Sequence, residues 1–170
     1  MAARKYLLAV AGACLVWIFG TACAAGERIL FSPDRVKEGE WVLFEVPGVG
    51  LKSKKTVVSV SGTGEDAVIT ILSEAEMDGI KMKGDVYKCT RAEMRQHVEN
   101  VSGSTDKTET VKVTVKGKEI EAEKRTWIRG NNVNYTYWSD DIPVNGVIKY
   151  AVRKGDEEKV SMELVDYGGR

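Results

Sequence analysis

The sequence predicts an all-β, mainly antiparallel protein: a single curved sheet, a half-barrel or a sandwich of about eight or nine strands with one short peripheral helix. Three observations indicate this fold class. Short segments in which apolar and polar residues alternate recur along the chain, as expected when successive side chains of a strand point to opposite faces. Turn-forming residues separate these segments at regular intervals. Only one stretch has a helical pattern, and nothing divides residues 26–170 into two domains.

The first half of the chain is expected to form a run of strands. Val42, Phe44 and Val46 share one apolar face, which should point to the core. Residues 47–55 begin with glycine and proline and continue with a basic run, so we interpret them as a loop. Gly84 predicts a bulge in the last strand of this half. The expected strands cover 41–46, 56–61, 67–72 and 80–87, and residues 29–31 form either a first short strand or an edge segment.

The one helical candidate covers residues 90–98. Thr90 followed by Glu93 fits a capping box, in which each residue satisfies a backbone N–H of the other. The apolar side of this segment is narrow, which favours a short, peripheral helix. Residues 100–108 are rich in serine, threonine and charge, and they are expected to form a surface loop.

The second half returns to alternation, with Val111, Val113 and Val115 expected to point inward. Asn145-Gly146 is the strongest two-residue turn signal in the chain, because both residues tolerate positive φ. This pair either closes a tight hairpin or ends a longer loop that starts at Ser139. The expected strands cover 110–115, 119–128, 132–138, 147–153 and 160–167.

The N-terminus has the pattern of a secretory signal peptide over residues 1–25. Arg4 and Lys5 precede an uncharged apolar stretch and then small residues. Cleavage before Cys23 or near Ala25 fits the sequence. Gly20-Thr21-Ala22-Cys23 also resembles a bacterial lipobox, although glycine stands where leucine is usual, and lipidation would then anchor the protein at Cys23. We expect an exported protein of the periplasm or cell envelope, a membrane-anchored lipoprotein if Cys23 is lipidated.

Charge and cysteine content exclude several classes of function. The chain has 25 basic and 25 acidic residues, and removal of the signal peptide leaves a slight negative excess, so nucleic-acid binding is not expected. After processing, Cys89 remains, beside Cys23 if that residue is lipidated. A disulfide within the chain therefore requires Cys23, and a zinc site of paired cysteines is excluded. We interpret Cys89 as a half-buried strand residue.

The sequence offers no catalytic constellation. His97 is the single histidine and lies in the polar helical candidate, where a solvated surface position is the simpler interpretation. Asp140 and Asp141 lie at a turn, where both are expected to be hydrated or to cap the backbone. We therefore expect no enzyme activity, no cofactor and no metal site.

Trp41, Trp127 and Trp138 are the candidate ligand-binding residues. Aromatic side chains that line a concave sheet face are suited to hold acyl chains, and on an exposed face they suit sugar rings or peptides. The alternative is that they pack in the core or cap the edge of a barrel.

Two short patterns resemble those of uncharacterised exported bacterial proteins: Gly39-Glu40-Trp41-Val42 and the stretch from Trp138 to Val147, WSDDIPVNGV. The spacing of strands between them is similar to that of small secreted or lipoprotein β-domains. Some of these are similar in outline to the lipoprotein-carrier proteins, whose curved sheet shelters a lipid chain. The resemblance implies a fold and no assigned activity.

Three hypotheses for the function follow. The first is an exported, non-catalytic β-domain that binds a hydrophobic ligand or a lipidated partner in the hollow of its sheet. The second is an envelope module with a filled core that binds or organises other proteins through its edges or loops. A hydrolase that uses acidic residues alone is the least favoured, third hypothesis.

Overall fold

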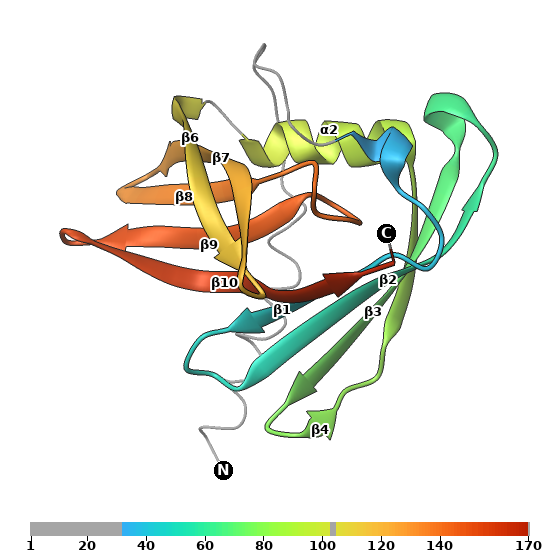
Figure 1. Cartoon of the computed structure of the whole chain (residues 1–170), viewed down its shortest axis with the longest axis horizontal. Helices are drawn as coiled ribbons and strands as arrows, with labels where there is room; N and C mark the ends of the chain where they lie inside the picture. The colour runs from blue at the N-terminus through green and yellow to red at the C-terminus, as the bar shows by residue number, and fades with distance from the viewer. Residues whose placement is uncertain (1–31, 103–104, 170) are drawn as a thin grey trace.

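The structure is a computed structural model that describes residues 32–102 and 105–169. These residues form one open, curved, antiparallel sheet of ten strands with one α-helix, so the predicted all-β class with a peripheral helix is confirmed (Figure 1). In chain order the elements are η1 (Pro33–Arg35), β1 (Trp41–Val46), β2 (Leu51–Ser61), η2 (Gly64–Asp66), β3 (Val68–Met77), β4 (Ile80–Lys81), β5 (Asp85–Thr90), α2 (Arg91–Ser102), β6 (Thr105–Val115), β7 (Lys118–Arg129), β8 (Asn132–Trp138), β9 (Val147–Lys154) and β10 (Glu157–Gly168).

The sheet is made of two meanders that meet at its middle. Its strand order is β4-β3-β2-β1-β10-β9-β8-β7-β6, and β5 pairs with β3 on the same side as β4. Strands β1 and β10 come from opposite ends of the described chain and pair antiparallel, Trp41 opposite Gly168. Helix α2 provides the connection between the first meander, β1–β5, and the second, β6–β10. The two halves therefore share one sheet.

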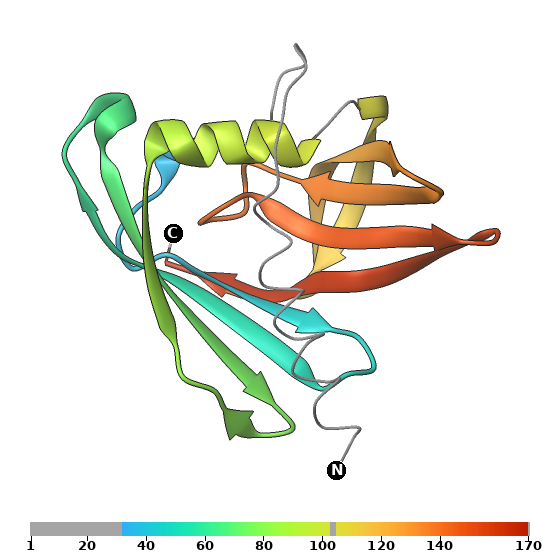
Figure 2. The ribbon, with the colours of Figure 1, turned by 180° about the vertical axis from the view of Figure 1, so that it is seen from behind.

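The curvature of the sheet leaves one open side, and two elements cover it. Helix α2 lies along that side, and the loop between β8 and β9 lies beneath the helix on the concave side of the sheet (Figures 1 and 2). We call residues 139–146 the interior loop. The N–H of Ser139 donates to the carbonyl of Gly146 at 2.8 Å, which closes the base of this loop. Asn145-Gly146 thus ends a longer loop and does not close a tight hairpin.

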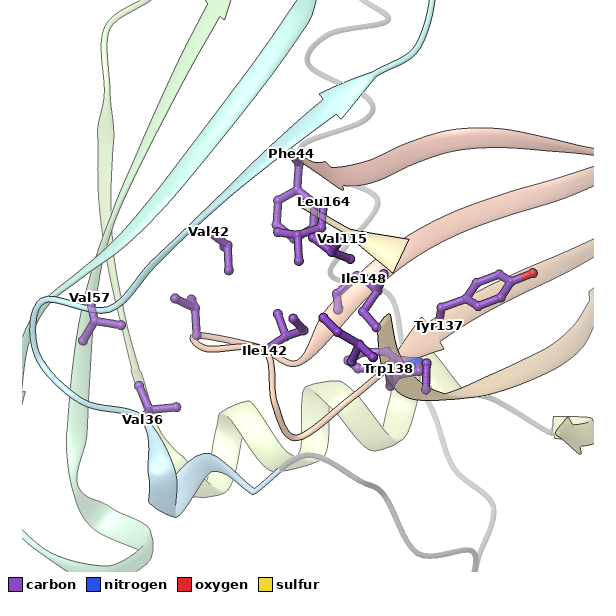
Figure 3. Close-up of a cluster of buried hydrophobic side chains, with 14 of the residues drawn as sticks. Val36, Val42, Phe44, Val57, Val115, Tyr137, Trp138, Ile142, Ile148 and Leu164 are labelled. Atoms are coloured by element: carbon purple, nitrogen blue, oxygen red, sulfur yellow. The ribbon is translucent and has the colours of Figure 1, made fainter. Parts of the chain in front are cut away.

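The core lies between the concave face of the sheet and these two covers. Val42 and Phe44 point inward from β1 and are 0% and 1% exposed, as their alternation predicts. Ile142 of the interior loop is 0% exposed and packs in the same cluster (Figure 3). Val115 from the end of β6 and Met94 from α2 join it. A single sheet therefore buries its inner face without a second sheet to pack against.

The start of α2 follows from its capping box. The N–H of Thr90 donates to Glu93 Oε2 at 2.7 Å, and the N–H of Glu93 donates to Thr90 Oγ1 at 3.1 Å. Two backbone donors that the helix leaves without intrahelical partners are satisfied in this way. The capping box is confirmed, and the helix ends at Ser102, beyond the predicted end at residue 98.

The interpretation of residues 47–55 as a loop is wrong beyond residue 50, because β2 begins at Leu51. Leu51 and Lys55 are buried, whereas Lys52 is exposed and Lys54 half-buried. The run of lysines hides this alternation, since lysines point to both faces of the strand. Pairing with β1 and with β3 on both sides satisfies the backbone and overrides the polar composition.

The predicted loop at residues 100–108 is also wrong for most of its length. The helix continues to Ser102, and β6 begins at Thr105, where it pairs with Trp127. Serine and threonine suit loops, but threonine is also a good strand residue, and the partner strand decides between the two. The predicted strand at residues 29–31 lies outside the described residues.

The edge of the first meander is irregular at Gly84, as the sequence predicts. Strands β4 and β5 both pair with β3, and the edge is interrupted at residues 82–84. A Cβ atom on Gly84 would lie 3.3 Å from Leu72 Cδ1 and from the carbonyl oxygen of Ser73. Glycine therefore allows a close approach of the chain to β3.

Replacing Thr90 by alanine should lower the free energy of unfolding by about 1 kcal/mol, because one helical N–H loses its side-chain acceptor. Urea unfolding followed by circular dichroism measures this change. Thr90→Ser keeps the hydroxyl and is the matched control. Equal stability of Thr90→Ala and the unmodified protein would contradict a role of the capping box in fixing α2.

Candidate functional site

The structure brings two of the three candidate tryptophans to one face of the sheet and places the third on the other. Trp138 is 3% exposed and packs in the core. Trp127 lies on the neighbouring strand on the same face, and its Nε1 donates to Thr136 Oγ1 at 3.1 Å. Trp41 alternates with the inward-pointing Val42 and therefore faces outward, where Lys54 Nζ lies 4.8 Å from its ring centroid. The three rings do not form one group.

The interior loop has an unusual backbone where it is most deeply buried. The N–H of Asn145 donates to the carbonyl of Pro143 at 2.8 Å, and Val144 between them has φ 69°. A β-branched residue with positive φ is a conformational outlier, and such residues cost on the order of 1–3 kcal/mol. Val144 is only 1% exposed, so its packing against the core offsets this strain.

Asp140 connects the interior loop to the first turn of the described chain. Its Oδ1 accepts a hydrogen bond from the N–H of Ser32 at 2.9 Å, and its Oδ2 lies 3.1 Å from Arg35 Nη1. Asp141 is exposed, and its N–H donates to Ser139 Oγ at 3.4 Å. The Asp140 carboxylate therefore tethers the interior loop to Ser32 and Arg35, whereas Asp141 takes part in the turn through its backbone N–H.

Lys55 is the most unusual polar residue of the interior face. It lies opposite Val42 in β1 and Ser73 in β3, and it alternates with the buried Val57 along β2, so it points into the core. Its exposed fraction is 9%. Burial lowers the pKa of Lys55 to about 8, because an ammonium group loses hydration in an apolar surrounding.

Two further polar groups lie on the same side of the sheet as Lys55. Ser53 lies two residues before Lys55 on the same face of β2. Its Oγ is buried and has no hydrogen-bond partner. His97 lies three residues after the buried Met94 on α2, and the pKa of His97 is lowered by burial and by the charge of Lys55. His97 is half-buried, which differs from the solvated position expected from the sequence.

A second polar cluster, separate from that around Lys55, lies on the face of β7 and β8 that also carries Trp138. Arg125 and Glu123 form a buried ion pair on β7, on the face that also carries Thr136 of β8. Arg125 Nη2 and Trp138 Nε1 are buried donors without a hydrogen-bond partner. Buried polar groups without partners cost free energy, so they are candidates to meet a ligand atom.

The outer polar cluster of the second meander has a structural role. Glu158 of β10 lies 2.7 Å from Lys124 Nζ and accepts a hydrogen bond from the Tyr137 hydroxyl at 2.6 Å, and Lys149 Nζ lies at 3.2 Å. Burial, together with the bond to Glu158, raises the pKa of Tyr137 to about 12. These contacts tie β7, β8, β9 and β10 together.

Sequence reasoning missed Lys55, Ser53 and Arg125. Each lies in a segment rich in charged or hydroxyl residues, a composition that predicts solvent-exposed side chains. The signal that points to Lys55 is its position two residues before Val57, which places both on one face once the strand is extended to Leu51.

Other site chemistry is not assembled in the described part of the chain. Within it, no three histidine, cysteine or acidic residues are grouped as metal ligands would be. Cys89 is half-buried, and burial together with the nearby Glu93 raises the pKa of its thiol, which makes it a poor nucleophile. None of the described helices combines the length and hydropathy of a membrane span.

Comparisons of the chain with protein-family models, with curated proteins and with solved structures found no match. The function is therefore inferred from the geometry of this chain.

Replacing Lys55 by methionine should raise the free energy of unfolding at pH 7 by about 3 kcal/mol, because a buried ammonium with a pKa near 8 is replaced by an apolar side chain of similar length. A lysine with a lowered pKa in the folded state destabilises that state fully below pH 8. The gain should shrink as the pH rises from 8 towards 10.5, where the unfolded lysine also loses its proton.

Urea unfolding at several pH values tests this prediction. Lys54→Met is the matched control, since Lys54 lies on the outer face over Trp41 and should lose only the weak cation–π contact. A clear loss of stability in Lys55→Met at pH 7 would show that Lys55 stabilises the fold.

Proposed function

We propose that this protein is an exported, non-catalytic β-domain that binds a hydrophobic ligand, such as a lipid chain or the acyl group of a lipidated partner, on the concave face of its sheet. In the absence of ligand, the interior loop occupies that face. No catalytic role is assigned to any residue.

One observation carries the proposal: the inner face of an open sheet is covered by a helix and a short loop, not by a second sheet. Ile142 and Val144 of this loop occupy the position that an apolar ligand would take against Val42 and Phe44. A loop closed at its base by one backbone hydrogen bond and strained at Val144 is better suited to leave than a paired strand. Departure of the interior loop would remove Ile142 and Val144 from the concave face and expose its apolar side chains.

The second candidate is an envelope module with a filled core that works through its edges. Complete burial of Ile142 favours it, since the hollow is then part of a stable core. The edge of the first meander also carries exposed apolar side chains, Ile80 at 69% and Val86 at 61%. An edge strand with apolar side chains can pair with a strand of another protein.

Replacing Ile142 by alanine separates the two candidates. The loss of a fully buried isoleucine should lower the free energy of unfolding by about 3 kcal/mol. If the concave face binds apolar ligands, the smaller side chain at position 142 should also tighten binding of the neutral dye N-phenyl-1-naphthylamine, measured by its fluorescence in a dye titration. Native mass spectrometry without detergent should show a co-purified apolar mass that leaves on denaturation.

The control is Val58→Ala, because Val58 is 46% exposed on β2 and its loss leaves the interior unchanged. Cooperative urea unfolding of each variant excludes dye binding to a partly unfolded state. A destabilised Ile142→Ala protein that binds no more dye than the unmodified protein would favour the filled-core module.

Export and anchoring are tested at Cys23, which lies outside the described residues, as does the whole predicted signal peptide. If Cys23 is lipidated, cells fed labelled palmitate should incorporate label into the protein. Cys23→Ser should then abolish the labelling and release the protein from the membrane fraction. An unlabelled mature protein whose N-terminus lies near Gly26 would show ordinary signal cleavage instead.

A further inference from the structure

Lys55 is a buried cation that forms no ion pair with a carboxylate of the described chain. The ion pairs between described residues do not include it. Glu40 lies on the same face, but its Oε2 accepts a hydrogen bond from the N–H of Lys37 at 3.1 Å. Asp85 shares the face from β5 and is exposed at the sheet edge. Among the described residues, Lys55 therefore has no carboxylate within ion-pairing distance, and the buried Glu40 is another charged group of this face.

Donors gather around this charge. Ser53 Oγ is buried without a partner on the same face of β2. From the helix side, His97 is close enough for the charge of Lys55 to disfavour its protonated form. An anion between β2 and α2 would meet the ammonium group and the hydroxyl, and it would offset the effect of the Lys55 charge on the pKa of His97.

A buried charge without a counter-ion costs several kcal/mol in general, so its presence points to a ligand that supplies the opposite charge. We propose that Lys55 and Ser53 bind the carboxylate of a fatty acid whose acyl chain replaces the interior loop against Val42, Val57 and Phe44. This inference rests on the proposed function, and it names the ligand class: a single-chain amphiphile with an anionic head.

The number of donors favours a carboxylate over a phosphate. Lys55 supplies one positive charge, and Ser53 supplies one neutral donor. A carboxylate carries one negative charge, which Lys55 balances. A phosphate monoester carries a charge of about −1.5 to −2 near neutral pH and three acceptor oxygens, so it would remain partly unneutralised in this surrounding.

The test compares ligands with the same chain and different heads on the delipidated full-length protein. Palmitate, hexadecanol, monohexadecyl phosphate and acetate each compete with N-phenyl-1-naphthylamine. We expect palmitate to bind about 10- to 100-fold more tightly than hexadecanol, the effect of hydrogen bonds to a charged group. Lys55→Met should lose this preference and keep the affinity for hexadecanol, and the control Lys54→Met should keep both.

The outcomes separate the inference from the function on which it rests. If neither palmitate nor hexadecanol binds, the proposed function fails. If both bind equally and Lys55→Met changes neither, the anionic site fails while the proposed function stands. Tighter binding of hexadecyl phosphate would overturn the choice of a carboxylate. Competition by acetate as strong as that of palmitate would overturn the role of the acyl chain.

A second measurement does not depend on a variant. His97 is the single histidine, so its ring gives one resolved set of nuclear magnetic resonance signals. Palmitate should shift these signals, because a negative charge placed at Lys55 changes the field at the imidazole, and hexadecanol should shift them less. Equal shifts with the two ligands would overturn the proposal.

Discussion

The packing of the interior loop into the hollow of the sheet is the interaction on which the rest of the structure depends. A single sheet has two faces, and an open curved one must cover its inner face to gain from the hydrophobic effect. Ile142 and Val144 do this together with Met94 of α2, and Val144 adopts a positive φ to reach its position. Burial of these side chains must outweigh that local strain for the fold to hold.

The second constraint is the pairing of β1 with β10, because it joins two meanders that are far apart in the chain. Helix α2 connects the meanders through the chain, and the β1–β10 ladder joins them into one curved surface. The inner face of that surface includes Lys55 from the first meander and Arg125 from the second, both buried. Arg125 is paired with Glu123, whereas Lys55 has no ion-pair partner among the described residues.

Particular elements show how far sequence reasoning reaches. The capping box of Thr90 and Glu93 and the inward face of Val42 and Phe44 were predictable, because each depends on a local pattern. At Gly84 the sequence predicted a bulge, and the structure has an interruption between β4 and β5. The start of β2 was not, since its lysines look like a solvated loop until β1 and β3 are placed on either side. The faces on which the three candidate tryptophans lie were not predictable either: Trp41 alternates with the inward-pointing Val42 and lies on the outer face, away from Trp127 and Trp138.

The sequence by itself determined the fold class, the periodicity of the strands and the position of the helix start, since alternation, turn residues and capping are local properties. It also predicts export from the N-terminal pattern. Only the tertiary structure decided that the stretch from Ser139 to Gly146 folds inward and not outward, and that Lys55 faces the core beneath α2. Both depend on the curvature of the whole sheet and on which distant strands become neighbours, and no local pattern carries that information.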